Sequence, residues 1–312
     1  MIISASRRTD IPAFYSEWFI NRIKSGFLLV KNPFNAHQVK RVSLLSKDVD
    51  VIVFWTRNPK KLIPHLDLLD QLGYRYYFQY TITGYNKKLE NNTLHPIKSV
   101  EVFKDLSRKI GKEKVIWRYD PIILSNMTPV SEHLRLFEKL AAMLSGYTNR
   151  VVISFADLYK KTEMNLNKID GLEYEDILQY EDELNNLCSK LKKIANKYGM
   201  SISTCAEEVN LESTGIKHGK CIDDGLIEEL FNIKVTNIKD QGQRLECGCV
   251  KSVDIGVYNS CLHGCTYCYA TYQKNGALNN YKKHDPNSPF LIGSGEGYEH
   301  FMEQIPIQNS LL

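Results

Sequence analysis

The sequence predicts an α/β fold, and more narrowly a partial parallel (β/α) barrel. Short runs of branched and aromatic residues alternate with amphipathic stretches over residues 1–205. The short runs are almost continuously apolar, as expected for strands that are covered on both faces of a parallel sheet. Glycines follow the amphipathic stretches, at positions where glycine commonly ends a helix. The 312 residues suffice for one such barrel.

Six segments are predicted strands because they are short and rich in branched or aromatic residues. They are Ile2–Ala5, Val51–Trp55, Tyr76–Ile82, Val115–Tyr119, Val151–Phe155 and Ser201–Cys205. Five segments with apolar residues at helical spacing are predicted helices. They are Pro12–Lys24, Pro59–Leu72, Ile97–Ile110, Val130–Leu144 and Tyr174–Lys197. The repeated order of strand and helix favours parallel strands.

Two regions depart from this alternation. The runs Phe27–Lys31 and Gln38–Leu44 surround an Asn-Pro-Phe-Asn turn, which predicts a β-hairpin insert at about residues 27–44. After a short predicted helix at Asp223–Phe231, the chain is loop-rich. We therefore expect three parts: a barrel, a cysteine-rich loop region packed on the barrel mouth, and a C-terminal extension. Their residues are 1–205 with 250–275, then 206–249, then 276–312.

Composition excludes several classes of protein. Hydrophobic residues make up 43% and charged residues 24%, which is typical of globular proteins and excludes disorder or collagen-like repetition. Apolar runs such as Val51–Trp55 are far shorter than the about 20 residues of a membrane span, so no membrane partner is expected. The net charge of +4 does not by itself indicate nucleic acid. Met1–Arg8 does not resemble a signal peptide, so we expect a cytoplasmic location.

The eight cysteines are unevenly distributed, since none occurs before Cys188 and seven lie between Cys205 and Cys268. In the cytoplasm, clustered cysteines more often bind metal than form disulfides. Cys261, Cys265 and Cys268 have the spacing C-x3-C-x2-C. Three thiolates on one short loop can hold one face of an iron–sulfur cluster and leave one iron open. The alternative is zinc, bound by Cys265 and Cys268 with help from His263 or Cys261.

This loop resembles the signature of the radical S-adenosylmethionine enzymes, and its H-G-C-x-Y-C-Y form resembles the spore photoproduct lyase-like branch. The resemblance implies that Cys261, Cys265 and Cys268 hold a [4Fe–4S] cluster whose open iron takes the amino and carboxylate groups of S-adenosylmethionine. It also implies a 5′-deoxyadenosyl radical that abstracts a hydrogen atom, and an electron donor such as flavodoxin or ferredoxin. The opening residues Ala5–Asp10 resemble a bacterial family of unassigned function.

In those enzymes the cysteine loop follows the first barrel strand, whereas here the β/α units precede it. A circular permutation reconciles the two, because domain termini often lie close together. A strand near Val253–Val257 would then lead into Cys261, with Ile2–Ala5 as the next strand. Further segments resemble the branch in consistent order: Thr9–Pro12, Trp55–Asn58, Tyr80–Thr83, Glu90 with Pro96, and Trp117–Ile123.

Chemistry in a parallel barrel lies at the carboxyl ends of its strands. Arg57, which stands where the branch has lysine, is the candidate for the carboxylate of S-adenosylmethionine, because guanidinium binds carboxylates bidentately. Tyr267 is the candidate for adenine contact. Further cofactor candidates are Thr9, Asp10 and Thr81, and the catalytic or substrate candidates are Arg118, Asp120 and Tyr269. The alternative is that the charged residues form structural ion pairs at the barrel rim, Arg118 with Asp120 among them.

A second group of four cysteines lies outside the motif: Cys205, Cys221, Cys247 and Cys249. Four thiolates are the number needed to bind a second [4Fe–4S] cluster or a structural zinc ion. Unliganded thiols are the third alternative. The sequence therefore predicts a radical enzyme, a lyase or a transferase, acting on a nucleic acid, a peptide or a small molecule. The competing hypothesis is a non-catalytic, zinc-stabilised protein that binds nucleic acid.

Overall fold

The computed structural model describes residues 1–302, without the side chains at 36 and 274, and the chain divides into two compact units. The first unit contains Met1–Tyr76, Ser252–Leu262 and the described residues from Ala270 onward. The second contains Tyr77–Lys251 and His263–Tyr269. The predicted α/β fold with parallel strands is confirmed. In the described residues, eight strands take part in parallel pairing. The strand order is β12-β1-β4 in the first unit and β11-β10-β8-β6-β5 in the second.

In the first unit, β1 (Ile2–Ala5) lies between β4 (Val51–Thr56) and β12 (Val253–Asp254). All three strands are parallel, and Ile3 of β1 pairs with Val253 of β12. The N-terminal strand therefore lies beside the strand that precedes Cys261, as the sequence predicts. β2 (Phe27–Asn32) and β3 (Asn35–Ser43) pair antiparallel as a hairpin at the expected place.

The helices of the first unit are more broken than predicted. The expected helix at residues 12–24 is two helices, α1 (Ile11–Phe14) and α2 (Ser16–Ser25), because Tyr15 leaves the helical conformation and its hydroxyl donates to the Ser260 carbonyl at 2.6 Å. The helix predicted over residues 59–72 is also wrong. Two 3-10 turns precede a short helix, because Pro64 lies inside the predicted helix, where proline disrupts helical hydrogen bonding. These elements are η1 (Pro59–Lys61), η2 (Ile63–His65) and α3 (Leu66–Gln71).

In the second unit, five parallel strands pair in the order β11-β10-β8-β6-β5. Their bounds are β5 (Tyr76–Thr81), β6 (Val115–Ile122), β8 (Arg150–Phe155), β10 (Ser201–Cys205) and β11 (Lys217–Gly219). The sequence did not predict β11, which lies in the region expected to be loop. Its three residues carry no apolar pattern, and the strand is defined by its pairing with Ser203–Cys205 of β10.

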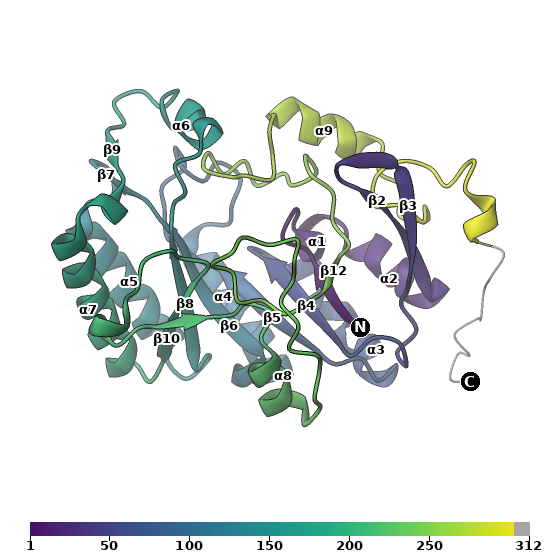
Figure 1. The fold of residues 1–312 in the computed structure, drawn as a ribbon, viewed down its shortest axis with the longest axis horizontal. Coiled ribbons are helices and arrows are strands. Elements are labelled where there is room, and N and C mark those ends of the chain that lie inside the picture. Colours follow the sequence, from purple (N-terminus) through teal and green to yellow (C-terminus); the bar gives the residue numbers. More distant parts are fainter. Residues whose placement is uncertain (303–312) are drawn as a thin grey trace. The chain divides into compact units, whose positions relative to one another are not determined.

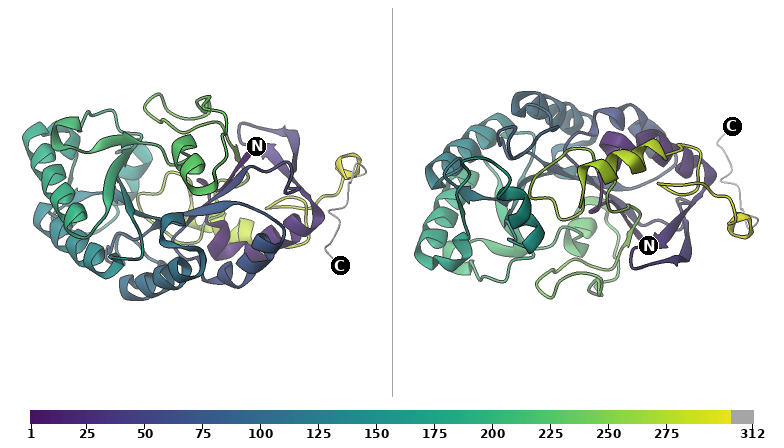
Figure 2. Two further views of the ribbon diagram at one scale, coloured as in Figure 1. Left: turned by 90° about the horizontal axis from the view of Figure 1, so that it is seen from below. Right: turned by 90° about the horizontal axis from the view of Figure 1, so that it is seen from above.

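Three long helices, α4 (Pro96–Ile110), α5 (Val130–Leu144) and α7 (Glu181–Lys197), lie along one side of these strands (Figures 1 and 2). The predicted start of α7 at Tyr174 is wrong, because Tyr174–Glu175 forms β9 and pairs antiparallel with β7 (Leu124–Ser125). The remaining elements are η3 (Lys112–Lys114), α6 (Lys160–Leu166), η4 (Ile177–Gln179), η5 (Glu212–Thr214), α8 (Asp224–Phe231), α9 (Lys274–Lys282) and η6 (Glu299–Phe301). Among the described residues, no helix has the length and hydropathy required to cross a bilayer.

Alternation along β6 separates apolar from polar side chains. Trp117 stacks on Phe137 of α5 with ring centroids 4.8 Å apart, and Tyr119 packs edge-on against the same ring. Arg118 lies between them in the sequence, so its side chain points to the opposite face of the strand. Gln79 of β5 lies on that same face, since Arg118 Nη1 approaches its amide oxygen at 3.4 Å. The second unit thus has a polar, buried face away from its long helices.

His133 of α5 provides a test of this packing. The ring is fully buried, with Nδ1 2.9 Å from the Tyr119 hydroxyl and Nε2 2.9 Å from the Ile123 carbonyl. Burial lowers the pKa of His133 from 6.5 to about 4. Between these pH values the His133 ring binds a proton in the unfolded chain but not in the folded chain. The free energy of unfolding should therefore fall as the pH drops from about 6.5 to about 4.

The loss attributable to His133 is on the order of 3 kcal/mol across that window. Urea denaturation at pH 7 and at pH 4.5 should show a smaller difference for His133→Gln than for the unchanged chain. Equal differences for the two proteins would contradict the assignment of a neutral, buried His133.

Candidate functional site

The carboxylate of Asp254 organises the segment that follows β1 in the first unit. It accepts hydrogen bonds from the Ser4 hydroxyl at 2.9 Å, the Ser6 hydroxyl at 2.5 Å and the Arg7 backbone N–H at 2.9 Å. The Gly256 N–H donates to the same carboxylate at 3.0 Å. Asp254 could not be selected from the sequence, because a single acidic residue carries no pattern.

Asp10 joins two further segments of the first unit. Its carboxylate accepts from the Ala13 N–H at 2.9 Å, capping α1, and from the Thr56 hydroxyl at 2.8 Å and the Arg57 N–H at 2.7 Å, at the end of β4. Asp10 and Arg57, both predicted to bind the cofactor, are therefore linked through the Arg57 backbone.

The Thr9 hydroxyl is buried in this part of the first unit. In the portion of the chain that the structure describes, its oxygen has no hydrogen-bond partner. A buried hydroxyl without a partner costs free energy, so water or a ligand is expected to satisfy it. Two cations flank this region: Arg7 lies 5.7 Å from the Trp55 ring centroid, and Arg8 lies 5.2 Å from that of Tyr258.

Cys261 follows β12 in the first unit. Because β12 runs parallel to β1, the segment leading to Cys261 leaves at the same ends of the strands as Ser6–Asp10. Burial, and after it the negative charge of a Cys261 thiolate, raises the pKa of Tyr15 above its ordinary value. Cys261 thus lies near the Tyr15 hydroxyl, which is held by Ser260.

Cys265 and Cys268 belong to the second unit, where their loop is bound to the segment after β5. The Cys268 N–H donates to the Cys265 carbonyl at 3.3 Å, and the Thr266 N–H donates to the Leu89 carbonyl at 3.0 Å. Lys161 Nζ donates to the Cys268 carbonyl at 3.0 Å. Burial lowers the pKa of Lys161, and the Cys268 thiolate opposes this effect. Convergence of all three motif thiols stays a prediction.

Tyr267, the candidate for adenine contact, is part of the same attachment. Its hydroxyl donates to the buried Glu90 carboxylate, which also accepts from the Thr83 hydroxyl at 2.6 Å. Its ring packs edge-on against Tyr85, with centroids 6.3 Å apart. The Tyr267 hydroxyl is therefore used in a hydrogen bond within the protein, and only the ring can contact a ligand. Tyr269, in contrast, is 52% exposed.

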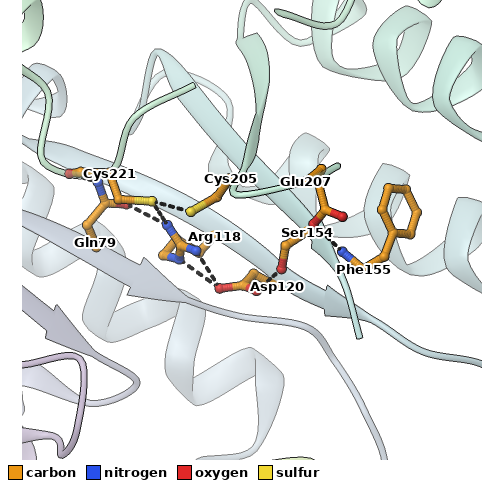
Figure 3. A network of polar contacts seen from close by, with 8 residues as sticks. All are labelled: Gln79, Arg118, Asp120, Ser154, Phe155, Cys205, Glu207 and Cys221. Carbon is orange, nitrogen blue, oxygen red and sulfur yellow. Dashed lines mark hydrogen bonds and ion pairs between the residues drawn. The ribbon is translucent and has the colours of Figure 1, made fainter. Parts of the chain in front are cut away.

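Arg118 and Asp120 form an ion pair on the polar face of the second unit (Figure 3). Arg118 donates to Asp120 Oδ2 from Nη2 at 2.6 Å and from Nε at 2.8 Å, and the Ser154 hydroxyl donates to the same carboxylate. Burial opposes the charge, but Asp120 and the neighbouring cysteine sulfurs raise the pKa of Arg118 above its ordinary value. The Arg118–Asp120 ion pair, one of the two alternatives that the sequence left open, is thus present.

Thr81, another predicted cofactor residue, lies at the end of β5 and is half-buried.

Beside this pair, the structure brings together the four cysteines outside the motif. Cys221 Sγ lies 2.7 Å from Cys205 Sγ and 2.7 Å from Arg118 Nη1 (Figure 3). Cys249 is hydrogen-bonded to Cys221 and to Cys247. The hydrogen bond from Cys221 lowers the pKa of Cys205, whereas burial raises the pKa of Cys221.

The Glu207 carboxylate lies beyond this cluster and accepts from the Phe155 N–H at 2.9 Å (Figure 3). Burial raises the pKa of Glu207 from 4.5 to about 8.

All eight cysteines lie in the described residues, and none forms a disulfide. Among the residues that the structure describes, no group of three or more His, Cys, Asp or Glu side chains has a geometry that could hold a metal ion.

A family model described as a domain of unknown function, DUF1848, matches residues 2–270. The chain belongs to the DUF1848 family. The range matched to DUF1848 contains all eight cysteines. No curated protein matches the chain. A solved structure from Bacteroides thetaiotaomicron VPI-5482, provisionally described as an alpha-L-fucosidase, has 12% identity and a TM-score of 0.28 over 83% of this chain and 94% of that one. This similarity carries no argument about function.

Gly256 is required where its loop approaches the Asp254 network. A Cβ atom at this position would lie 2.0 Å from Ser6 Oγ and 2.6 Å from Ser6 Cβ. Gly256→Ala should therefore lower the free energy of unfolding by about 1–3 kcal/mol, the usual cost of overpacking. The control is Gly276→Ala in α9, where a Cβ would meet its nearest neighbour, Gln273 Cβ, at 3.7 Å. Urea denaturation compares the two, and equal stability of both variants would refute the steric argument.

Proposed function

We propose that this protein is a cytoplasmic radical S-adenosylmethionine enzyme that abstracts a hydrogen atom from its substrate. The observation that carries the proposal is the C-x3-C-x2-C motif. Its three cysteines are half-exposed and are not in disulfides. Cys261 follows β12, whose carboxyl end coincides with that of β1, and chemistry in parallel α/β proteins lies at such ends.

The donor set suits an iron–sulfur cluster, since accessible thiolates are its usual ligands. Cys261, Cys265 and Cys268 would hold a [4Fe–4S] cluster. Such a cluster, when bound and reduced by a flavodoxin- or ferredoxin-type donor, supplies the electron that splits S-adenosylmethionine into methionine and a 5′-deoxyadenosyl radical.

The protein's own contribution is to position the loop. Backbone hydrogen bonds join it to residues 89–92: Thr266 N–H donates to the Leu89 carbonyl at 3.0 Å, and Asn92 N–H donates to the His263 carbonyl at 2.9 Å. Tyr267 adds a side-chain anchor through Glu90. These contacts fix the backbone on both sides of Cys265, so its thiol can bind without first ordering the loop.

In the first unit, three residues have chemistry that suits S-adenosylmethionine. The Arg57 guanidinium would bind the carboxylate, and its backbone is held by Asp10. The Asp10 carboxylate, an acceptor by its chemistry, would bind the amino group or a ribose hydroxyl. The buried Thr9 hydroxyl would gain a partner from the ligand. Thr81, Arg118, Asp120 and Tyr269 are proposed to serve the cofactor or the substrate.

We further propose that the fold is a partial parallel (β/α) barrel in circularly permuted order. Two findings support this: β12 precedes the cysteine loop, and it pairs parallel with the N-terminal strand β1. In the unpermuted order of the radical enzymes, the loop-bearing strand comes first and β1 would follow it. The proposed substrates are a nucleic acid, a peptide or a small molecule.

The first test is iron binding. After anaerobic reconstitution with iron and sulfide, the unchanged chain should gain about four irons, and the variant with Cys261, Cys265 and Cys268 all changed to Ala should gain none. Cys188→Ala is the control, because that buried thiol lies on α7 and has its pKa raised by burial to about 12. Release of 5′-deoxyadenosine after reduction should follow iron content. Equal iron in the triple variant, or a colourless unchanged chain, would refute the proposal and favour a zinc protein.

The second test concerns Arg57. Arg57→Ala should weaken S-adenosylmethionine binding by about 1.5–3 kcal/mol, the usual contribution of a charge-assisted hydrogen bond. Iron content should not change, because Arg57 offers no ligand atom to iron. The control is Lys61→Ala, an exposed cation on η1. Anaerobic titration calorimetry measures both. If Arg57→Ala binds S-adenosylmethionine as tightly as the unchanged chain, Arg57 does not bind the cofactor carboxylate. If the variant loses iron, Arg57 has a structural role.

A further inference from the structure

The second cysteine group arises from the pairing of two parallel strands. Cys205 is the last residue of β10 and lies opposite Gly219 of β11, so Cys221 follows at the same edge. The segment carrying Cys247 and Cys249 is attached there through the Val250 N–H, which donates to the Ile222 carbonyl at 3.1 Å. Residues separated by up to 44 positions along the chain are thereby brought to one place within the second unit.

The four thiols form a continuous series of contacts. Cys221 contacts Cys205, with the sulfurs 2.7 Å apart, and also contacts Cys249, which contacts Cys247. Cys221, Cys247 and Cys249 are 1%, 6% and 2% exposed. A redox disulfide would need two thiols, whereas a structural tetrathiolate metal site needs four. The contact of all four therefore favours a metal site over a single disulfide.

Two hydrogen-bond donors contact the sulfurs of this group. Arg118 donates from Nη1 to Cys221 Sγ at 2.7 Å, and the Ile222 N–H donates to Cys249 Sγ at 3.4 Å. Donors of this kind commonly surround metal-bound ligands and fix their orientation. The backbone at Cys221 is held as well, because the Tyr77 hydroxyl and the Gln79 amide donate to its carbonyl at 2.7 and 2.9 Å.

The compactness of the group distinguishes a single ion from a cluster. Zn–S bonds of about 2.3 Å in a tetrahedron place sulfurs about 3.8 Å apart. In a [4Fe–4S] cluster each thiolate binds a different iron, so the sulfurs stand farther apart. The Cys205 and Cys221 sulfurs, now in contact, would need to separate by about 1 Å to admit zinc. A change of this size is a side-chain adjustment.

We propose that Cys205, Cys221, Cys247 and Cys249 bind one structural zinc ion. The site lies within the second unit and does not depend on the proposed radical chemistry. Zinc binding would release the protons of the thiols and hold the loop containing Cys247 and Cys249 against the ends of β10 and β11.

The test uses the full chain with Cys261, Cys265 and Cys268 changed to Ala, so that the motif cannot bind metal. Purified from zinc-supplemented cells, it should contain about one zinc per chain by mass spectrometry. Adding Cys247→Ser and Cys249→Ser should reduce zinc at least tenfold, whereas adding Cys188→Ser should not. Replacing zinc by Co²⁺ should give the visible bands of tetrahedral cobalt thiolate.

A second measurement avoids the risk that a buried cysteine variant fails to fold. In the same parent protein, the four thiols should resist alkylation under native conditions and become reactive when a chelator removes zinc. Iron with sulfide in the parent protein would replace zinc by a cluster and overturn the proposal. A Cys205–Cys221 disulfide, or four thiols that stay reactive with excess Zn²⁺, would also overturn it. Failure of the radical proposal would appear separately, as an unchanged chain that binds zinc but no iron.

Discussion

A strand that is covered by helices on one side must direct every second side chain to the other side. In the second unit this constraint determines where polar chemistry can occur. Trp117 and Tyr119 of β6 pack on α5, and Arg118 between them is directed to the opposite, buried face. A buried guanidinium requires partners, and it has Asp120, Gln79 and Cys221. The ion pair is therefore a consequence of this alternation, and the thiol group lies beside it through the contact of Cys221 with Arg118.

The first unit depends on a different element, a single carboxylate in a short strand. β12 has two residues, too few for backbone pairing alone to be strong. Asp254 adds three hydrogen bonds to Ser4, Ser6 and Arg7 at the end of β1. The strand that precedes Cys261 is thus held by side-chain chemistry as much as by its ladder. Gly256 permits the close approach that this network needs.

Much of the fold could be predicted because its strands are almost continuously apolar, and β1, β4, β5, β6, β8 and β10 lie where this pattern places them. The helix breaks at Tyr15 and Pro64 were missed, and at Tyr15 the break accompanies a hydrogen bond to the distant Ser260, which no local pattern indicates. β11 was missed because its residues carry no strand pattern. For the candidate sites, the uneven distribution of cysteines was enough to group Cys205, Cys221, Cys247 and Cys249. The contacts of Tyr267 with Glu90 and of Asp254 with Ser6 could not be predicted, since they join residues far apart in the chain.

The division of the chain has a consequence for its synthesis. The first unit needs both the N-terminal 76 residues and the segment Ser252–Leu262, which supplies β12. At about 5–20 residues per second, a ribosome takes roughly 10–35 s to translate the intervening residues. During that time β1 has one unpaired edge, because Ile3 and Ser4 lack the β12 residues with which they later pair. The β1 edge must therefore stay unpaired, and open to aggregation or to chaperones, until Ser252–Leu262 has been translated.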